Sequence, residues 1–404
     1  MRIAIVGCGY IAASYANALP HHPELELVGA WDIDAQRLDA FVKRYGGRAF
    51  ASEAKCLENG RVDTIANLTN PRVHHAITSA ALRAGKHVWS EKPLAMNGAE
   101  AKSLVDLARE RGLMLASAPC SALSETAETV RAALQAGVVG RPRLVYANFD
   151  DGMIAPRLSP WNWRNEVGAA WPARDEFEVG CTYEHAGYLL TWLASFFGPV
   201  RRVTSFAACL LPDKGIAVSS MAPDFTTGCL EYDDGVVARL TCSLVAPEDK
   251  SLTIIGDLGA LRVDNVRHER CPVRYRTWTL PRIGAAIERR VNALCLSMGL
   301  TALREGWTSW RSFPYVAPPP RWLAGRKPVD FLRGLSEMAA ALRERRACRL
   351  PAELGWHVAE IIDALQSPAG GSEGRVIESR FPPIGSRFDP PEATRRVRTR
   401  GEYT

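Results

Sequence analysis

The sequence predicts an α/β protein with two parts, an N-terminal doubly wound domain and a C-terminal α+β domain with a mostly antiparallel open sheet. Three observations support this prediction. The chain has 404 residues, enough for two domains of ordinary size. Residues 1–120 alternate short apolar runs with helical stretches, as repeated βαβ units do. From about residue 121 onward, strands separated by hairpin turns dominate.

In the first 120 residues, helices end at recognisable stops. Pro20 ends the first helix, because proline cannot continue one, and Gly85 closes the third. The expected strands cover residues 3–6, 25–31, 64–68, 87–89 and 114–117. The expected helices cover residues 11–19, 35–45, 74–84 and 100–111.

The second part begins with one expected helix over residues 125–136. Asp233-Asp234-Gly235 then forms a hairpin turn between two apolar runs. The expected strands cover residues 144–149, 203–210, 229–232, 236–244, 252–255 and 261–263. Two further helices are expected at 328–345 and 352–365.

These elements suggest a first domain over residues 1–120 and a second over 121–366, with 272–326 as a divergent insertion. Apolar residues at helical spacing from Ile283 to Met298 indicate an amphipathic helix there, packed on its own domain or serving as a lid or subunit contact. Three consecutive prolines make 316–322 a stiff connector. Residues 367–404 are rich in glycine, proline and arginine, so a poorly ordered basic tail is expected.

The composition excludes several classes of protein. Hydrophobic residues make up 47% of the chain and charged residues 23%, which is ordinary for a globular protein. With no apolar run of about 18 residues and no secretory leader, we expect no membrane association and a cytoplasmic location. The ten cysteines contain no C-x-x-C pair, so reduced thiols and no metal site are expected. The net charge of +6 comes largely from tail arginines, and no recognition motif points to nucleic acid.

The first strand runs into a glycine-rich loop of the form G-x-G-x-x-A. Gly7 allows a tight turn, Gly9 lets the backbone approach a pyrophosphate, and Ala12 lets helix and strand pack closely. Asp32 ends the second strand, twenty positions past Ala12, where it would bind the adenosine ribose and repel a 2′-phosphate. NAD is therefore the expected cofactor, with NADP kept as the minority alternative by nearby Arg37. The residues of this loop expected to bind the dinucleotide are Gly7, Gly9, Tyr10, Ile11 and Ala12.

Lys92 stands directly after the expected strand 87–89, in the segment Glu91-Lys92-Pro93. Open α/β sheets bind ligands outside the carboxyl ends of their strands, which would place this ammonium near a nicotinamide. A lone lysine is more commonly a solvated surface charge, so position alone does not assign it a role.

Four segments together resemble the Gfo/Idh/MocA oxidoreductases, a family named for glucose-fructose oxidoreductase and inositol dehydrogenase. They are the glycine-rich loop, Thr69-Asn70-Pro71-Arg72-Val73-His74, Gly85-Lys86-His87-Val88 and Glu91-Lys92-Pro93. The resemblance is strong over residues 1–120 and weaker over 121–270 and 327–366. It implies a Rossmann domain, an open-sheet second domain, a nicotinamide cofactor, and hydride transfer at a hydroxyl of a sugar or polyol.

The resemblance also implies roles for particular residues of the first domain. Lys92 would hydrogen-bond the reacting hydroxyl, and the Lys92-Pro93 bond is expected to be cis. Besides the glycine-rich loop and Asp32, the residues expected to contact the cofactor are Thr69, Asn70, His74, Glu91 and Lys92.

Members of this family usually carry Asp-x-x-x-His at the start of a helix in the second domain. Counting back from Phe196-Phe197-Gly198-Pro199 places Glu184 and Tyr188 at these positions. In having a tyrosine at the histidine position, the chain resembles glucose-fructose oxidoreductases. We expect the charge of Lys92 to lower the pKa of the Tyr188 phenol. His185 is the alternative proton-transfer group, because imidazole titrates near neutrality, although a core role is as strongly expected for it.

A Trp-Arg segment before this helix also resembles the family. Trp163 and Arg164 are therefore expected to bind substrate, the tryptophan against a sugar ring and the arginine on an anionic group. Arg157 and Arg174 are alternatives to Arg164, and simple packing is the alternative for the tryptophan.

The sequence thus predicts an NAD-dependent dehydrogenase or reductase acting on a small carbohydrate-like molecule. The predicted catalytic residues are Lys92, Tyr188, His185 and Glu184. Redox-assisted glycoside cleavage with recycled NAD and a non-catalytic NAD-binding regulator are the alternatives. The resemblance further implies a homo-oligomer, either a dimer or a tetramer.

Overall fold

The computed structural model describes residues 1–154, 161–278, 290, 293–294, 297–298, 310–323, 329–367 and 374–386. Most of the predicted helix over 283–298 therefore lies outside the described residues. Arg157 and residues 387–404 lie outside them as well.

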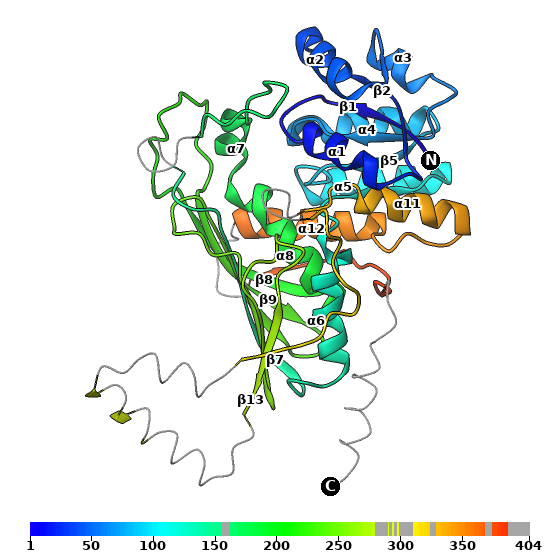
Figure 1. Cartoon of the computed structure of the whole chain (residues 1–404). Helices are drawn as coiled ribbons and strands as arrows, with labels where there is room; N and C mark the ends of the chain where they lie inside the picture. Colours follow the sequence, from blue (N-terminus) through cyan, green and yellow to red (C-terminus); the bar gives the residue numbers. More distant parts are fainter. Residues whose placement is uncertain are drawn as a thin grey trace.

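The first 120 residues form a six-stranded parallel sheet with helices around it (Figure 1). The strand order is β3-β2-β1-β4-β5-β6, the doubly wound arrangement that the sequence predicts. The strands are β1 (Arg2–Val6), β2 (Glu26–Trp31), β3 (Arg48–Ala49), β4 (Thr64–Asn67), β5 (His87–Ser90) and β6 (Leu115–Ser117). The helices are α1 (Ala12–Ala18), α2 (Ala35–Tyr45), α3 (Glu53–Leu57), α4 (His74–Arg83) and α5 (Gly98–Arg111). Of these, the short β3 and α3 were not predicted.

The second sheet has nine strands in the order β14-β13-β12-β11-β7-β10-β9-β8-β15. Only β7 and β10 pair in parallel among these neighbours, which confirms the predicted mostly antiparallel sheet. The strands are β7 (Pro142–Asp150), β8 (Val200–Ala208), β9 (Phe225–Tyr232), β10 (Val237–Ser243), β11 (Leu252–Gly256), β12 (Gly259–Val263), β13 (Val273–Thr277), β14 (Arg311–Ser312) and β15 (Arg375–Val376). Both β13 and β14 come from the 272–326 stretch and were not predicted.

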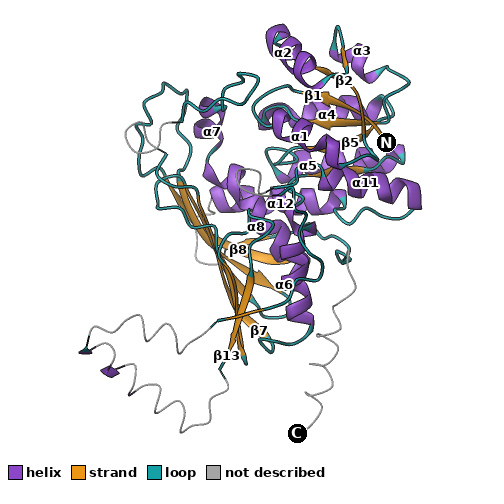
Figure 2. Ribbon diagram, in the orientation of Figure 1, coloured by secondary structure: helices purple, strands orange, loops and turns teal. Residues whose placement is uncertain are grey.

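Helices cover one face of this second sheet and join it to the first (Figure 2). The helices after residue 120 are α6 (Glu125–Gln135), α7 (Ala173–Val179), α8 (Cys181–Phe197), α11 (Arg333–Glu344) and α12 (Ala352–Gln366). Of these, α6, α8 and α12 pack on the second sheet, whereas α7 packs on α8. Helix α12 packs on α5 as well as on α8 and β8, so it belongs to the contact between the two sheets. Helix α11 reaches back to the first sheet at Gly334, where a Cβ atom would lie 2.0 Å from the buried Trp89 ring.

The structure corrects one prediction about the C-terminal segment. Within the stretch expected to be poorly ordered, β15 pairs with β8, and Ile377, Phe381 and Ile384 are buried in the core. Burial of these three side chains compensates for the entropy lost in ordering residues 374–386. The polar composition of the segment as a whole did not suggest this order.

Among the described residues, no helix is long and apolar enough to cross a membrane.

Candidate active site

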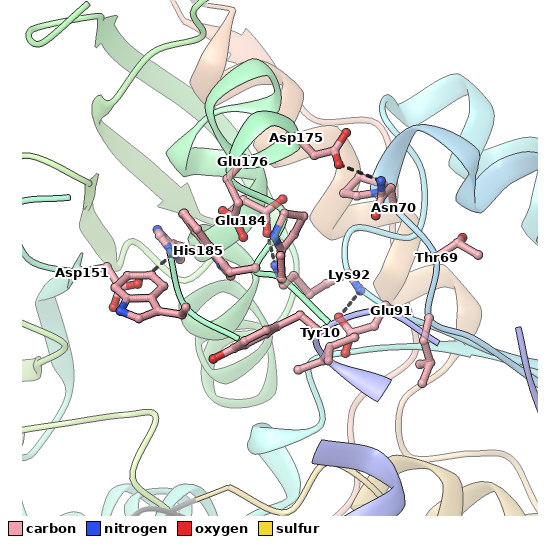
Figure 3. A pocket seen from close by; sticks show the side chains of 18 of the residues that line it. Tyr10, Thr69, Asn70, Glu91, Lys92, Asp151, Asp175, Glu176, Glu184 and His185 are labelled. Carbon is pink, nitrogen blue, oxygen red and sulfur yellow. Dashed lines mark hydrogen bonds and ion pairs between the residues drawn. The ribbon is translucent and has the colours of Figure 1, made fainter. Parts of the chain in front are cut away.

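A cavity of about 470 Å³ lies where the carboxyl ends of β1, β4 and β5 meet helices α7 and α8 (Figure 3). One wall comes from the first sheet and includes Tyr10, Asn70 and Lys92. The opposite wall includes Glu184 and His185 of α8. The first turn of α8 and the end of β5 are therefore brought together, as the sequence predicts.

The glycine-rich loop forms the floor of this cavity. Gly7 has φ +93°, and a Cβ atom there would lie 2.8 Å from the Leu68 backbone, so only glycine fits. Gly9, Tyr10 and Ile11 line the cavity, whereas Ala12 is buried beneath it. The loop thus presents backbone to the cavity and keeps side chains out of the turn, which fits a dinucleotide pyrophosphate.

Asp32 lies at the end of β2 and is almost fully buried. Its carboxylate accepts hydrogen bonds from the backbone N–H groups of Cys8 and Asp34, both at 2.7 Å. Arg37 donates to it at 3.0 Å. Asp32 itself does not line the cavity, although Arg37 does.

The loop after β4 carries Thr69 and Asn70 into the cavity wall. Thr69 donates its hydroxyl to Asn67 at 2.6 Å, and Asn70 donates to Asp175 of α7 at 2.7 Å. His74 differs from the prediction, because it is fully buried and does not line the cavity. Its ring nitrogens lie 2.7 Å from the Pro93 carbonyl and 2.8 Å from the Thr69 carbonyl. His74 therefore links the loop after β4 to the loop after β5.

Lys92 follows β5, and its bond to Pro93 is cis, as the family resemblance implied. The Glu91 carboxylate accepts hydrogen bonds from the Lys92 backbone N–H at 2.9 Å and from Tyr15 at 2.8 Å. The Lys92 ammonium pairs with Glu184 across the cavity. Burial opposes this charge, but Glu184 and the other surrounding acids outweigh burial and raise the pKa of Lys92. Lys92 is therefore a permanent cation and hydrogen-bond donor.

Glu176 of α7 is an acid of this cavity that the sequence did not single out. It is buried, and its Oε2 atom has no hydrogen-bond partner among the described residues. Burial and the neighbouring charge of Glu184 raise the pKa of Glu176 well above its ordinary value. Two acids from the second domain thus lie near the Lys92 ammonium: Glu184, which pairs with it, and Glu176, whose raised pKa favours the uncharged form.

The side chains of Tyr188 and His185 both pack against the aromatic ring of Phe149, a residue of β7. Phe149 stacks on His185 with centroids 5.0 Å apart and on Tyr188 with centroids 5.1 Å apart. The expected lowering of the Tyr188 pKa is wrong. Burial raises it, and the opposing charges of Arg267 and Lys92 do not overcome that effect.

His185 has a carboxylate partner that the family motif did not indicate. Its Nε2 lies 3.4 Å from Asp151 Oδ2, and its buried Nδ1 has no partner among the described residues. Asp151 also pairs with Lys250 at 2.5 Å. Burial alone would raise the pKa of Asp151, but His185, Lys250 and Arg267 together lower it, so Asp151 is an anion.

Of the two residues predicted to bind substrate, Trp163 lies in the cavity wall and Arg164 does not. Trp163 lines the cavity and packs edge-on against Trp171 with ring centroids 4.9 Å apart. Arg164 is exposed, donates to the Gly168 carbonyl at 2.7 Å and does not line the cavity. Arg174 is exposed and does not line it either.

Arg267 also lines the cavity, and the sequence did not single it out. It comes from the segment after β12, and its guanidinium lies 5.4 Å over the Tyr188 ring. No spacing in the sequence relates it to Lys92 or Glu184, so only the folded chain reveals it. Among the described residues, no cluster of three or more potential metal ligands is present.

Two family models match the chain over most of the two sheets. The NAD-binding Rossmann fold of the oxidoreductase family matches residues 1–118, and the GFO/IDH/MocA C-terminal domain matches residues 127–262. The chain belongs to the Gfo/Idh/MocA oxidoreductase family. This confirms the resemblance seen in its motifs, and the chain is an oxidoreductase with an NAD(P)-binding Rossmann domain.

Relatives of this Gfo/Idh/MocA member include characterised enzymes. Trans-1,2-dihydrobenzene-1,2-diol dehydrogenase of Mus musculus is 25% identical over 270 residues, which are 66% of this chain and 75% of that protein. The WlbA dehydrogenase from Bordetella pertussis, solved with NADH and UDP-GlcNAcA, has TM-score 0.63 and 20% identity, covering 90% of this chain and 94% of that one. KijD10, a 3-ketoreductase from Actinomadura kijaniata solved with NADP and TDP-benzene, has TM-score 0.67 and 20% identity, covering 90% and 96%. Both structures share the fold.

Proposed function

We propose that the protein transfers a hydride between a nicotinamide dinucleotide and a hydroxyl or keto carbon of a sugar or sugar derivative. The observation that carries this proposal is the Lys92–Glu184 pair, which stands in one cavity with the backbone of the glycine-rich loop. The dinucleotide, when bound, supplies or accepts the hydride. Gly9, Tyr10 and Ile11 would hold it, together with Thr69 and Asn70.

Lys92 binds the oxygen of the reacting carbon. Because its ammonium keeps its proton, it acts by donating a hydrogen bond to that oxygen and stabilising negative charge there. Glu184 holds the ammonium in place, and neutral Glu176 adds no second negative charge beside it. The three residues therefore orient the substrate oxygen without removing its proton.

His185 exchanges the substrate proton in this proposal. Nδ1 is buried and does not open on the cavity, so Nε2, which lies 3.4 Å from Asp151 Oδ2, is the ring nitrogen assigned to this exchange, and Asp151 orients the ring and stabilises the imidazolium. Tyr188 has a raised pKa and remains a phenol, which suits it to hydrogen bonding rather than to proton removal. We expect His185→Ala to lower turnover by ~10² to 10⁴ and Tyr188→Phe by a smaller factor in steady-state assays. The reverse order would assign the proton to Tyr188.

NAD is the proposed cofactor rather than NADP. Asp32 puts a fixed negative charge at the end of β2, where a 2′-phosphate would lie, and Arg37 is already engaged by this carboxylate. Initial rates with NAD and NADP should therefore give a higher kcat/KM for NAD. A preference for NADP in the unaltered protein would reverse this assignment.

The experiment that tests the activity is a panel of sugars, sugar phosphates and nucleotide sugars incubated with NAD, with absorbance of reduced nicotinamide as the readout. The keto products are assayed with NADH in the opposite direction. Reduced nicotinamide formed with at least one sugar compound, and lost in Lys92→Ala, is the expected result. NAD binding without reduced nicotinamide for any compound would instead favour a regulator or a reaction that recycles NAD.

A homo-oligomer is also proposed, on the basis of one face of the second sheet. Tyr146 and Phe206 are exposed on this face, and cross-strand register places both on the same side. Exposed aromatic residues on an open sheet face are typical of subunit contacts. Light scattering after size-exclusion chromatography should give a dimer or tetramer for the protein and a smaller species for Phe206→Glu.

A further inference from the structure

Residues 163–171 of the second domain form a small hairpin beside the cavity. The Trp171 N–H donates to the Trp163 carbonyl at 2.9 Å, and both residues line the cavity. The side-chain oxygen of Asn165 accepts two backbone N–H groups of the same hairpin, at 2.9 and 3.1 Å. The hairpin is therefore held by its own hydrogen bonds and has a defined shape.

The amide of Asn165 also reaches the first domain. Its Nδ2 donates to the Tyr10 carbonyl at 3.1 Å and to the Gly9 carbonyl at 3.4 Å. The next residue, Glu166, accepts a hydrogen bond from Tyr45 of α2 at 2.8 Å. The hairpin is thus attached both to the glycine-rich loop and to the helix that follows β2.

The chain that follows the hairpin is attached to the other loop of the cofactor site. Asn70, in the loop after β4, donates to Asp175 of α7 at 2.7 Å. A guanidinium nitrogen of Arg72, from the same loop, lies 3.5 Å from the Glu178 carboxylate. Residues 163–178 therefore bond to both loops, and we call this segment the strap.

The crevice for a dinucleotide lies between these two loops. The strand order reverses between β1 and β4, and open α/β sheets bind their ligand in the crevice at such a point. The strap closes this crevice on the side of the second domain, because Trp163 and Trp171 line the same cavity as both loops. Its bonds use carbonyl groups of the glycine-rich loop, whereas a pyrophosphate binds to N–H groups, so strap and dinucleotide do not compete.

We propose that the strap controls the exchange of the dinucleotide, with Asn165 as the positioning residue that attaches it to the glycine-rich loop. The strap separates from a loop each time a dinucleotide enters or leaves, and it re-forms its bonds afterwards. Weakening these bonds therefore lowers the barrier to entry and to exit alike. This inference goes beyond the proposed function, because it concerns cofactor exchange and holds whatever compound the oxidoreductase acts on.

The test measures association and dissociation rates of the reduced dinucleotide by stopped-flow fluorescence, on the full chain without substrate. NADH or NADPH is used, whichever binds more tightly. We expect Asn165→Ala to raise both rates about fivefold, the factor given by the net loss of one hydrogen bond, while the dissociation constant changes little. Tyr45→Phe, which removes the bond to Glu166 and leaves the hairpin unaltered, should raise both rates as well. Asn162→Ala is the matched control, because this exposed asparagine lines neither this cavity nor the adjoining one, and it should leave both rates unchanged.

Two outcomes would overturn the inference, once the melting temperatures show that the variants are folded. Unchanged rates in both Asn165→Ala and Tyr45→Phe would show that the strap does not limit exchange. A faster dissociation alone, with an equal loss of affinity, would show that Asn165 stabilises the bound dinucleotide and does not control its passage. If no sugar compound reduces NAD while both rates are still raised in the variants, the dehydrogenase assignment fails and the role of the strap stands.

Discussion

Lys92 places a positive charge at the carboxyl end of β5, in the wall of the cavity. Replacing it with alanine removes the hydrogen-bond donor to the reacting oxygen but leaves the glycine-rich loop intact. We expect Lys92→Ala to lower kcat by ~10² to 10³, the usual loss when one such donor is removed. NAD affinity, measured by tryptophan fluorescence quenching, should change little.

Lys102→Ala is the control for this change, because Lys102 is exposed and pairs with Asp106 on α5. Since Lys92→Ala leaves Glu184 buried without its partner, the melting temperature must be measured alongside. Unchanged kcat in a folded Lys92→Ala protein would contradict the role of the ammonium.

Glu176 and Glu184 are neighbouring carboxyl groups in different surroundings, since Glu184 pairs with Lys92 and the pKa of Glu176 is raised. Because the pKa of Glu176 is raised, its uncharged glutamine counterpart should preserve turnover, whereas Glu184→Gln removes the charge that holds Lys92. We expect kcat close to that of the unaltered protein for Glu176→Gln and a loss of ~10²-fold for Glu184→Gln.

The pH profile distinguishes a charge effect from a structural one. Ionisation of Glu176 at high pH would place two negative charges beside Lys92, so turnover of the unaltered protein should fall there. Glu176→Gln should keep its turnover to higher pH. Identical profiles for the two proteins would contradict the assignment of the neutral acid to Glu176.

At the level of helices and strands, His357 links α12 to the C-terminal segment. Val200 N–H donates to its Nε2 at 2.9 Å, so Nδ1 carries the proton, with Ser379 Oγ 2.8 Å away. Burial, with the charge of Arg380, lowers the pKa of His357 from 6.5 to about 3. The imidazole is therefore neutral in the folded protein over the whole neutral and mildly acidic range.

This lowered pKa makes stability depend on pH. Below pH 6.5 the unfolded chain binds a proton at His357 that the folded chain does not, so the free energy of unfolding falls by up to ~1.4 kcal/mol per pH unit toward pH 3. Urea unfolding should show a smaller loss between neutral and acidic pH for His357→Gln, which cannot titrate. Equal losses in both proteins would contradict the assignment.

Helices and strands were predicted from the sequence where their own residues mark their boundaries or their apolar pattern. Proline and glycine stops set α1 and α4, and apolar runs between turns set β9 and β10. The C-terminal segment was missed because Ile377, Phe381 and Ile384 are few among polar residues, and β8, which lies far away in the sequence, completes their pairing. The glycine-rich loop and Lys92 came from local motifs, Glu184 from its spacing to Phe196-Phe197-Gly198-Pro199, and His185 from its place next to Glu184.

Residues of the site that were not predicted depend on tertiary contacts alone. Glu176 and Arg267 lie on separate elements, and their neighbours, rather than their spacing, determine what they do. His74 matched a cofactor motif, yet burial turned it into a brace between Thr69 and Pro93. The raised pKa of Tyr188 likewise reflects burial, which the charge of Lys92 does not offset.

At the scale of the whole molecule, a buried ion network joins four segments around α11. Arg333 pairs with Glu125 of α6 at 3.0 Å and with Glu269 at 2.7 Å. Asp330, beside it, accepts from His22 of the first domain at 2.9 Å. The network therefore connects the glycine-rich half of the molecule to the second sheet, and the cavity lies between these halves.

Removing Arg333 leaves buried acids without their counter-charge. We expect Arg333→Met to lower the free energy of unfolding by ~3 to 5 kcal/mol, as measured by urea unfolding at neutral pH. Burial already raises the pKa of Glu269 to about 7 against the opposing charge of Arg333, so loss of Arg333 raises it further. An acid whose pKa is raised in the folded state loses stability as pH rises, so the deficit of the variant should shrink in mild acid. Adding Glu269→Gln to Arg333→Met should recover part of the lost stability, because the uncompensated acid is then gone. A deficit that is independent of pH and unchanged in the double variant would show that Arg333 acts by packing and not by charge.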